Sequence, residues 1–206
     1  MPEITTALSL LLVTAVLGYL LGSVPFGMVM ARLFGLGDLR RIGSGNIGAT
    51  NVLRTGNRTA AVLTLVLDAA KGAVAVLAAR AALGEDAAQV AGFFAFVGHC
   101  YSAFLRLNGG KGVATFLGTL LALAWPVGLT ACAVWLLTAA ALRISSLAAL
   151  TAAALGPPAT LLLGRPDALL FAAALTVVIF LRHAPNIGRL VRGTEPRIGS
   201  GKAPSA

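Results

Sequence analysis

The chain has 206 residues, of which 58% are hydrophobic and only 11% are charged, against roughly 25% charged residues in a soluble domain. This composition excludes a soluble globular protein and indicates a polytopic membrane protein. The formal charge of +9 is not that of a nucleic-acid-binding surface, because the Lys and Arg residues lie in short loops between apolar runs, without interleaved aromatic residues. The charge instead favours membrane orientation and an anionic substrate.

Seven apolar runs predict an all-α fold with seven transmembrane helices. They cover residues 4–30, 59–82, 86–106, 113–125, 126–142, 146–163 and 167–185, judged against the roughly 20 residues that a helix needs to cross a bilayer. The first run is expected to be a helix rather than a cleavable signal, because no Lys or Arg precedes Arg32. The fourth and fifth runs are short, and they form either one helix kinked at Pro126 or two helices that turn at Trp125-Pro126.

The distribution of cations favours seven spans over six. With seven spans, one side of the membrane holds Arg32, Arg40, Arg41, Arg54, Arg58, Arg106, Lys111, Arg143, Arg182, Arg189, Arg192, Arg197 and Lys202, and the other side keeps Arg80 and Arg165. The positive-inside rule assigns the cation-rich side to the cytoplasm. We therefore predict one membrane domain over residues 1–206, with its N-terminus outside, its C-terminus in the cytoplasm and a disordered tail at 196–206.

The first motif, at residues 41–58, is polar, rich in glycine and cationic. It reads Arg-Ile-Gly-Ser-Gly-Asn-Ile-Gly-Ala-Thr-Asn-Val-Leu-Arg-Thr-Gly-Asn-Arg. Its glycines allow successive backbone amides to converge on one anion. Short polar side chains and cations complete the pattern: Ser44, Asn46, Thr50, Asn51, Arg54 and Arg58. The motif predicts an anion site beside the membrane, with a positive-inside loop as the alternative.

The second motif, at residues 98–115, contains Gly-Gly-Lys-Gly at 109–112, directly before an apolar run. Amides at a helix N-terminus bind phosphate readily, and Lys111 adds a full charge. The motif lacks the spacing and the preceding strand of a P-loop. Taken alone, it is equally consistent with a plain connecting loop.

The third motif, at residues 182–195, carries His183 and Asn186, which share a face if the helix continues past Pro185. His183 is either an interfacial polar cap or a catalytic group. For Arg189 and Arg192, the alternative to a role in the site is that they only orient the protein in the membrane by the positive-inside rule.

Within the spans, Asp68 and Lys71 are three residues apart, which predicts an intramembrane ion pair that supports the structure. His99 is expected to form a hydrogen bond within the bundle or to orient the glycine loop. Cys100 and Cys132 are interpreted as small hydrophobic residues, since they show no metal-ligand spacing.

Together, the three motifs resemble those of the acyl-phosphate-dependent glycerol-3-phosphate acyltransferases of bacterial membranes, the PlsY family. The resemblance covers essentially the whole chain; one departure is Ser102-Ala103, where the family usually has Pro-Val. It implies acyl transfer from acyl phosphate to the 1-hydroxyl of sn-glycerol 3-phosphate, which yields lysophosphatidic acid and phosphate. This first acylation of phospholipid synthesis would take place at the cytoplasmic face of the inner membrane.

The resemblance also implies the site. Ser44, Arg54 and Lys111, with the Gly109 and Gly110 amides, would hold the phosphates, and His183 and Asn186 would position glycerol phosphate. The expected substrate-binding residues are Asn46, Thr50, Asn51, Gly109, Gly110, Asn186 and Glu195.

No metal or cofactor is expected, and membrane lipid is the other expected partner. Ser44 has no base nearby in the sequence, so direct transfer is preferred to an acyl-enzyme; either His183 or a substrate phosphate accepts the hydroxyl proton. A transporter of phosphorylated metabolites is the rival interpretation. It is disfavoured because the cations gather at one surface rather than near the midplane.

Overall fold

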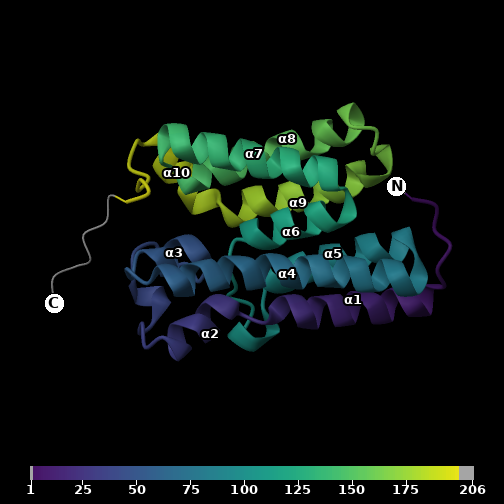
Figure 1. The fold of residues 1–206 in the computed structure, drawn as a ribbon, viewed down its shortest axis with the longest axis horizontal. Helices are drawn as coiled ribbons and strands as arrows, with labels where there is room; N and C mark the ends of the chain where they lie inside the picture. The colour runs from purple at the N-terminus through teal and green to yellow at the C-terminus, as the bar shows by residue number, and fades with distance from the viewer. Residues whose placement is uncertain (1, 200–206) are drawn as a thin grey trace.

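The computed structural model describes residues 2–199, and within this range the regular elements are all helices. Figure 1 shows two layers, α1 to α5 on one side and α7 to α10 on the other, with α6 between them. The helices are α1 (Leu8–Ser23), α2 (Phe26–Leu33), α3 (Ala49–Leu53), α4 (Arg58–Leu83), α5 (Glu85–Cys100), α6 (Val113–Leu123), α7 (Trp125–Leu142), α8 (Ser145–Leu162), α9 (Leu169–Arg182) and α10 (Ala184–Val191), with short 3-10 turns at Leu39–Arg41, Ala103–Leu105 and Pro166–Ala168.

Five helical segments are long and apolar enough to cross a membrane: α1 with α2, α4, α5, α7 and α8. A sixth segment is formed by α9 and α10 together, with a bend of 64° between them. Helix α6 has 11 residues, about 16 Å at 1.5 Å per residue, which is too short to cross alone. The predicted fourth and fifth runs are two separate helices, because the helical conformation is interrupted at Ala124 and α6 packs against α7.

Small residues allow the helices to pack closely, as is usual between helices in a membrane. Gly22 of α1 faces Ala95 of α5, and Gly118 of α6 faces Ala69 of α4 so closely that a Cβ at either glycine would overlap the facing carbonyl oxygen. The contact at Gly118 holds α6 against α4 in the middle of the molecule, where α6 forms part of the site described below.

The first span is interrupted between α1 and α2, and polar side chains satisfy the carbonyls at the break. Lys71 Nζ donates to the carbonyl of Val24 at 2.8 Å, and Ser102 Oγ donates to the carbonyl of Ser23 at 2.6 Å. Such carbonyls need partners when no water is present. Lys71 Nζ also lies 2.8 Å from Asp68 Oδ1, which confirms the predicted ion pair. Ser102 is one of the two residues at which this sequence departs from the family pattern, and its hydroxyl satisfies the Ser23 carbonyl.

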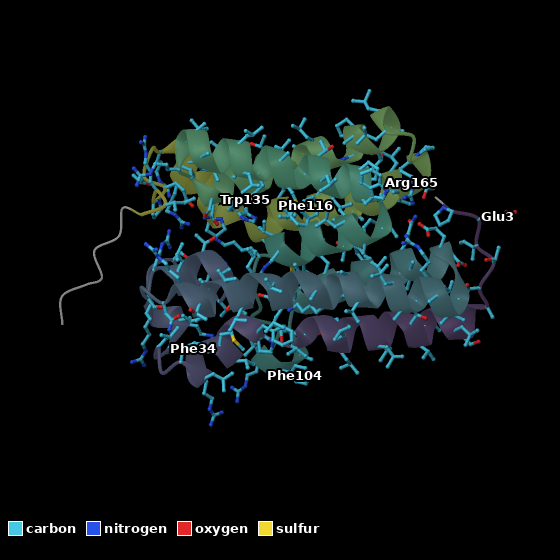
Figure 2. The ribbon with its side chains drawn as sticks, viewed as in Figure 1. Glu3, Phe34, Phe104, Phe116, Trp135 and Arg165 are labelled. Atoms are coloured by element: carbon cyan, nitrogen blue, oxygen red, sulfur yellow. The ribbon has the colours of Figure 1, made fainter. Side chains whose placement is uncertain are left out.

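The two ends of the bundle differ in charge. The connection from α2 to α4, the turn from α7 to α8, and α10 lie at the end opposite the start of α1 (Figure 1), and these segments contain Arg40, Arg41, Arg54, Arg143 and Arg189. At the other end, where Figure 2 labels Arg165 and Glu3, Arg80 and Arg165 both pair with Glu85 and both donate to the carbonyl of Leu123. These two arginines therefore cap the C-terminus of the short helix α6.

Part of the tail predicted to be disordered is described. Ile198 pairs with Arg143: its N–H donates to the Arg143 carbonyl, and its own carbonyl accepts from the Arg143 guanidinium at 2.8 Å. Residues 200–206 of that predicted tail lie outside the described residues.

Candidate active site

A cavity of about 560 Å³ lies where the three motifs meet. The first motif and α4 form one wall, α7 and α10 form the opposite wall, and the segment that begins α6 lies between them. Nine of the eleven predicted site residues line the cavity: Ser44, Asn46, Thr50, Asn51, Arg54, Lys111, His183, Asn186 and Glu195. The structure thus brings together residues that are up to 151 positions apart, from Ser44 to Glu195 (195 − 44).

Asn51 holds the first motif in shape. Its buried side chain donates through Nδ2 to the carbonyls of Leu39 and Ile42, both at 3.0 Å. Its Oδ1 accepts from the N–H of Ser44 at 3.0 Å and from Arg54 Nη1 at 3.4 Å. Both N–H groups and the oxygen of this amide are engaged within the motif, so Asn51 orients the Ser44 backbone and the Arg54 guanidinium. Direct contact of Asn51 with substrate stays a prediction, and the residue does line the cavity.

Gly43 makes this arrangement possible. Its φ is +52°, a left-handed conformation that glycine adopts without strain. A Cβ at this position would lie 2.6 Å from Asn51 Oδ1 and 2.7 Å from Arg54 Cδ. Only a residue without a side chain allows these two groups to meet against the backbone.

The second motif places Lys111 in the cavity, whereas the two glycines before Lys111 do not line it. The N–H of Gly110 donates to the carbonyl of His99 at 2.9 Å, and Gly109 and Gly110 are not among the residues that line the cavity. Phosphate binding by the Gly110 amide stays a prediction, and it would require this N–H to exchange its bond to the His99 carbonyl. Lys111 Nζ donates to Asn186 Oδ1 at 2.6 Å, and an ammonium has two further donors for a ligand.

The third motif bends at His183, between Leu169–Arg182 and Ala184–Val191, so His183 and Asn186 do not lie on one continuous helix. Both nevertheless line the cavity. The Nδ1 atom of His183 lies 2.8 Å from the carbonyl of Ile179. Since a carbonyl can only accept, Nδ1 carries a proton, and Nε2 is the acceptor of the neutral ring.

Glu195 connects the third motif to α8. Its Oε1 accepts from Ser146 Oγ at 2.7 Å and from Asn186 Nδ2, and its Oε2 accepts from Arg189 Nε at 2.7 Å. Burial alone would raise the pKa of this carboxyl, but the hydrogen bonds from Ser146, Asn186 and Arg189 hold the pKa below its ordinary value. Glu195 is therefore ionised and fixes Asn186, which in turn meets Lys111.

Lys111 is the most perturbed cation of the site. Burial lowers its pKa from 10.5 to about 8; Glu195 opposes this shift, and the positive charges of Arg189, Arg54 and Arg182 add to it. The ammonium is therefore charged at neutral pH but held among like charges. An anionic ligand would relieve this repulsion, which makes the site suited to phosphate.

One wall of the cavity is apolar. Val62 and Leu65 of α4, Leu117 of α6, and Trp135 and Leu136 of α7 form this wall, and Figure 2 shows Trp135 between the two layers. Val62, Leu65 and Leu136 are 57%, 47% and 61% exposed. They belong to helices long enough to cross a membrane, so this apolar wall includes side chains that are exposed on the faces expected to meet lipid. One site thus joins a cationic end to an apolar wall, which fits a molecule with an anionic head and an alkyl chain.

The arrangement of these motifs is that of a known family. The model of the glycerol-3-phosphate acyltransferase family matches residues 12–193. The chain belongs to this family. A glycerol-3-phosphate acyltransferase of Jannaschia sp. is 69% identical over 198 residues, which cover 96% of this chain and 98% of that protein. The enzyme of the same name from Cereibacter sphaeroides is 65% identical over 199 residues, covering 97% and 95%.

The fold agrees with this assignment. The chain is similar to the crystal structure of PlsY (YgiH), an integral membrane glycerol 3-phosphate acyltransferase, in its glycerol 3-phosphate form, with a TM-score of 0.86 and 39% identity. The match covers 92% of this chain and 96% of that one. The family resemblance expected from the three motifs is confirmed, and so is an all-helical fold of the PlsY type.

Three residues that the motifs do not assign to the site contact it or line it in this acyltransferase. Ser146, at the start of α8, donates a hydrogen bond to Glu195. The only sequence signal for this contact is the polar pair Ser145-Ser146 before an apolar run. Asp68 lines the cavity as well as pairing with Lys71. Arg182 was counted only as an orientation charge, whereas it contacts the glycine loop of the second motif.

Proposed function

We propose that this glycerol-3-phosphate acyltransferase moves an acyl group from acyl phosphate to the 1-hydroxyl of sn-glycerol 3-phosphate, and that it releases lysophosphatidic acid and inorganic phosphate. The observation that carries the proposal is the single cavity in which Arg54 and Lys111 lie next to an apolar wall with side chains exposed on faces expected to meet lipid. Both substrates carry phosphate, and the donor also carries an alkyl chain. PlsY, similar at 39% identity, is a glycerol 3-phosphate acyltransferase described in a glycerol 3-phosphate form and in a lysophosphatidic acid form.

The residues divide between the two substrates. Arg54 and Ser44, held by Asn51, would bind the phosphate of the donor, and Lys111 would reach the phosphates of both substrates from between the two layers. Asn46 and Thr50 would shape the same pocket.

The third motif would bind glycerol 3-phosphate. His183 offers Nε2 as an acceptor for a glycerol hydroxyl, and Asn186 is fixed between Lys111 and Glu195. The acceptor would then lie across the cavity from the donor, with its 1-hydroxyl turned to the donor carbonyl. Holding two reactants in this way can account for much of a rate enhancement.

Transfer would be direct. The acceptor oxygen bonds to the donor carbonyl carbon, the bond from that carbon to the phosphate oxygen breaks, and the hydroxyl proton leaves with phosphate as the new hydrogenphosphate. Ser44 is not favoured as a nucleophile, because its Oγ meets Asn51 Oδ1, and an amide oxygen is too weak a base to activate it. Lys111 and Arg54 would neutralise the leaving phosphate, which is the main electrostatic task of the site.

The proposed topology has seven passes, with the N-terminus outside and the C-terminus in the cytoplasm of the bacterial inner membrane. Helix α6 would be a partial pass held inside the bundle by α4 and by the arginine cap at Leu123. The cation-rich end, which carries the site, would face the cytoplasm by the positive-inside rule.

The test is an assay of the purified protein in detergent with labelled glycerol 3-phosphate and three donors: acyl phosphate, acyl-CoA and the acyl carrier protein thioester. We expect lysophosphatidic acid from acyl phosphate alone. Lys111→Ala and Arg54→Ala should each lose most of this activity, whereas Arg41→Ala, an exposed arginine of the same loop, should keep it. Equal turnover of a thioester would refute the proposed donor.

A further inference from the structure

The loop that presents Lys111 is held by an arginine from a distant helix. Arg182, the last residue of α9, donates through Nε to the carbonyl of Gly110 at 3.1 Å and through Nη2 to the carbonyl of Gly109 at 3.0 Å. Its guanidinium also lies over the ring of Tyr101, 5.0 Å from the ring centroid. The carbonyls of two successive residues thus accept hydrogen bonds from one planar guanidinium, whose N–H groups are fixed in a fork that suits this geometry.

The loop needs such an external hold. Between α5 and α6 the backbone takes left-handed conformations at two consecutive residues with side chains, Arg106 (φ 51°) and Leu107 (φ 64°), and again at Gly112 (φ 81°). These conformations are sterically costly for L-residues and persist only where surrounding contacts enforce them. The hydrogen bond from Gly110 to His99 secures one side of the loop, and Arg182 secures the other.

Arg182 also connects two parts of the site. The next residue is His183, which lines the cavity, and Asn186, one turn further on, accepts from Lys111 Nζ at 2.6 Å. Two contacts therefore hold the Lys111 loop against the third motif: the Arg182 bonds to its backbone and the Lys111 bond to Asn186. We propose that Arg182 is a positioning residue of the acyl transfer: it fixes the Gly109–Lys111 backbone against the end of α9 and so places the Lys111 ammonium between the two phosphates. This inference rests on the proposed function of the site.

The charge of Arg182 gives the proposal a second, independent readout. Five charged or titratable groups act at Lys111: Glu195 from the C-terminal segment, Arg189 from α10, Arg54 directly after α3, Arg182 from α9, and the His183 ring at the α9–α10 bend. Arg182 is one of the charges that lower the pKa of Lys111. Removing that charge, or releasing the loop from its buried place, raises the pKa of Lys111.

The experiment compares three variants in the full-length protein in detergent. Arg182→Gln removes the fork and the charge, Arg182→Lys keeps the charge but not the fork, and Arg192→Gln is the matched control, an exposed arginine of the same motif. We expect Arg182→Gln to lower kcat/KM about 100-fold, the order of loss that a displacement of about 1 Å can cause. We expect Arg182→Lys to lose most of the activity as well, and Arg192→Gln to lose none.

The pKa of Lys111 is measured directly by competitive acetylation with trace acetic anhydride over pH 6–11, with mass spectrometry resolving each lysine. We expect a higher pKa of Lys111 in Arg182→Gln, a smaller rise in Arg182→Lys, which keeps the charge but releases the loop, and no change in Arg192→Gln. A folded Arg182→Gln protein with parental kcat/KM, or with an unchanged Lys111 pKa, would overturn the proposal. If Arg182→Gln does not fold, the activity of Arg182→Lys decides: parental kcat/KM refutes the role of the fork. Absence of turnover by the parent protein would instead refute the proposed function, while the acetylation result would still report on the loop.

Discussion

The depressed pKa of Lys111 predicts how the enzyme responds to alkaline pH. The ammonium is the charged form, so a pKa lowered to about 8 means that its charge is present below pH 8 and lost as the pH rises through this value. About half of the free enzyme is protonated at pH 8 and about one tenth at pH 9. The phosphates are already dianionic in this range, since their second pKa is about 6. We therefore expect kcat/KM to fall about tenfold per pH unit above pH 8, and kcat to fall at a higher pH, because bound phosphate stabilises the ammonium.

Two replacements of Lys111 separate its charge from its titration. Lys111→Met removes a charged hydrogen bond of about 1.5–3 kcal/mol and should lower kcat/KM roughly 10- to 150-fold at pH 7. Lys111→Arg retains a charge that does not titrate below pH 12. Whatever activity Lys111→Arg keeps should therefore lack the fall above pH 8.

The assay is continuous release of phosphate from acyl phosphate in the presence of glycerol 3-phosphate, from pH 6 to pH 10, corrected for spontaneous donor hydrolysis. A parent profile that is flat to pH 9.5 would refute the reasoning. So would a Lys111→Arg profile with the same alkaline fall, because another group would then be titrating.

Three further predictions concern the structure around the site. Asp68→Asn or Lys71→Met alone should destabilise the folded protein by about 3–5 kcal/mol, because each leaves a buried charge without its partner, whereas the double variant should lose less; additive losses in thermal unfolding would contradict this. His183→Gln should raise the KM for glycerol 3-phosphate more than it lowers kcat; a loss confined to kcat would identify the ring as the base. Ser146→Ala should raise the same KM roughly tenfold, through one lost hydrogen bond to the charged Glu195; a parental KM would show that this bond does not position Asn186.

The helices and the three motifs could be predicted from the sequence because each is a local pattern. Each of the seven apolar runs is helical, and the short fourth run is α6, bounded by Gly112 and Ala124. The interruption of the first run has a proline as its only local signal, and hydropathy does not predict it. It occurs at Pro25, in the middle of an apolar stretch, and it is stable because Lys71 and Ser102 satisfy the freed carbonyls from other helices. Hydropathy along one segment contains no information about such partners.

The members of the site could be predicted better than their individual roles. Asn51 and Asn186 have the same side chain and both lie in polar motifs, yet Asn51 bonds to the backbone of its own loop, and Asn186 links two distant side chains. In the same way, the glycine amides before Lys111 matched a phosphate loop, but the Gly110 donor is used by His99. Which polar groups remain free depends on contacts between helices, and these contacts are not visible in residue type or spacing.

The site is divided between the two layers of the fold, and this division follows from the chemistry. Arg54 and Ser44 belong to the layer of α1 to α5, whereas His183, Asn186 and Glu195 belong to the other layer, with Lys111 at the junction. In the proposed reaction, a donor with an alkyl chain would enter from lipid and a soluble acceptor from water. The apolar wall at Leu65 and Leu136 and the cationic end beside Glu195 would provide these two routes to one point. Because the two substrates would bind to residues of different layers, their relative placement would depend on the contacts between the layers. The chief contacts are those of Lys111 with Asn186 and of Arg182 with the glycine loop.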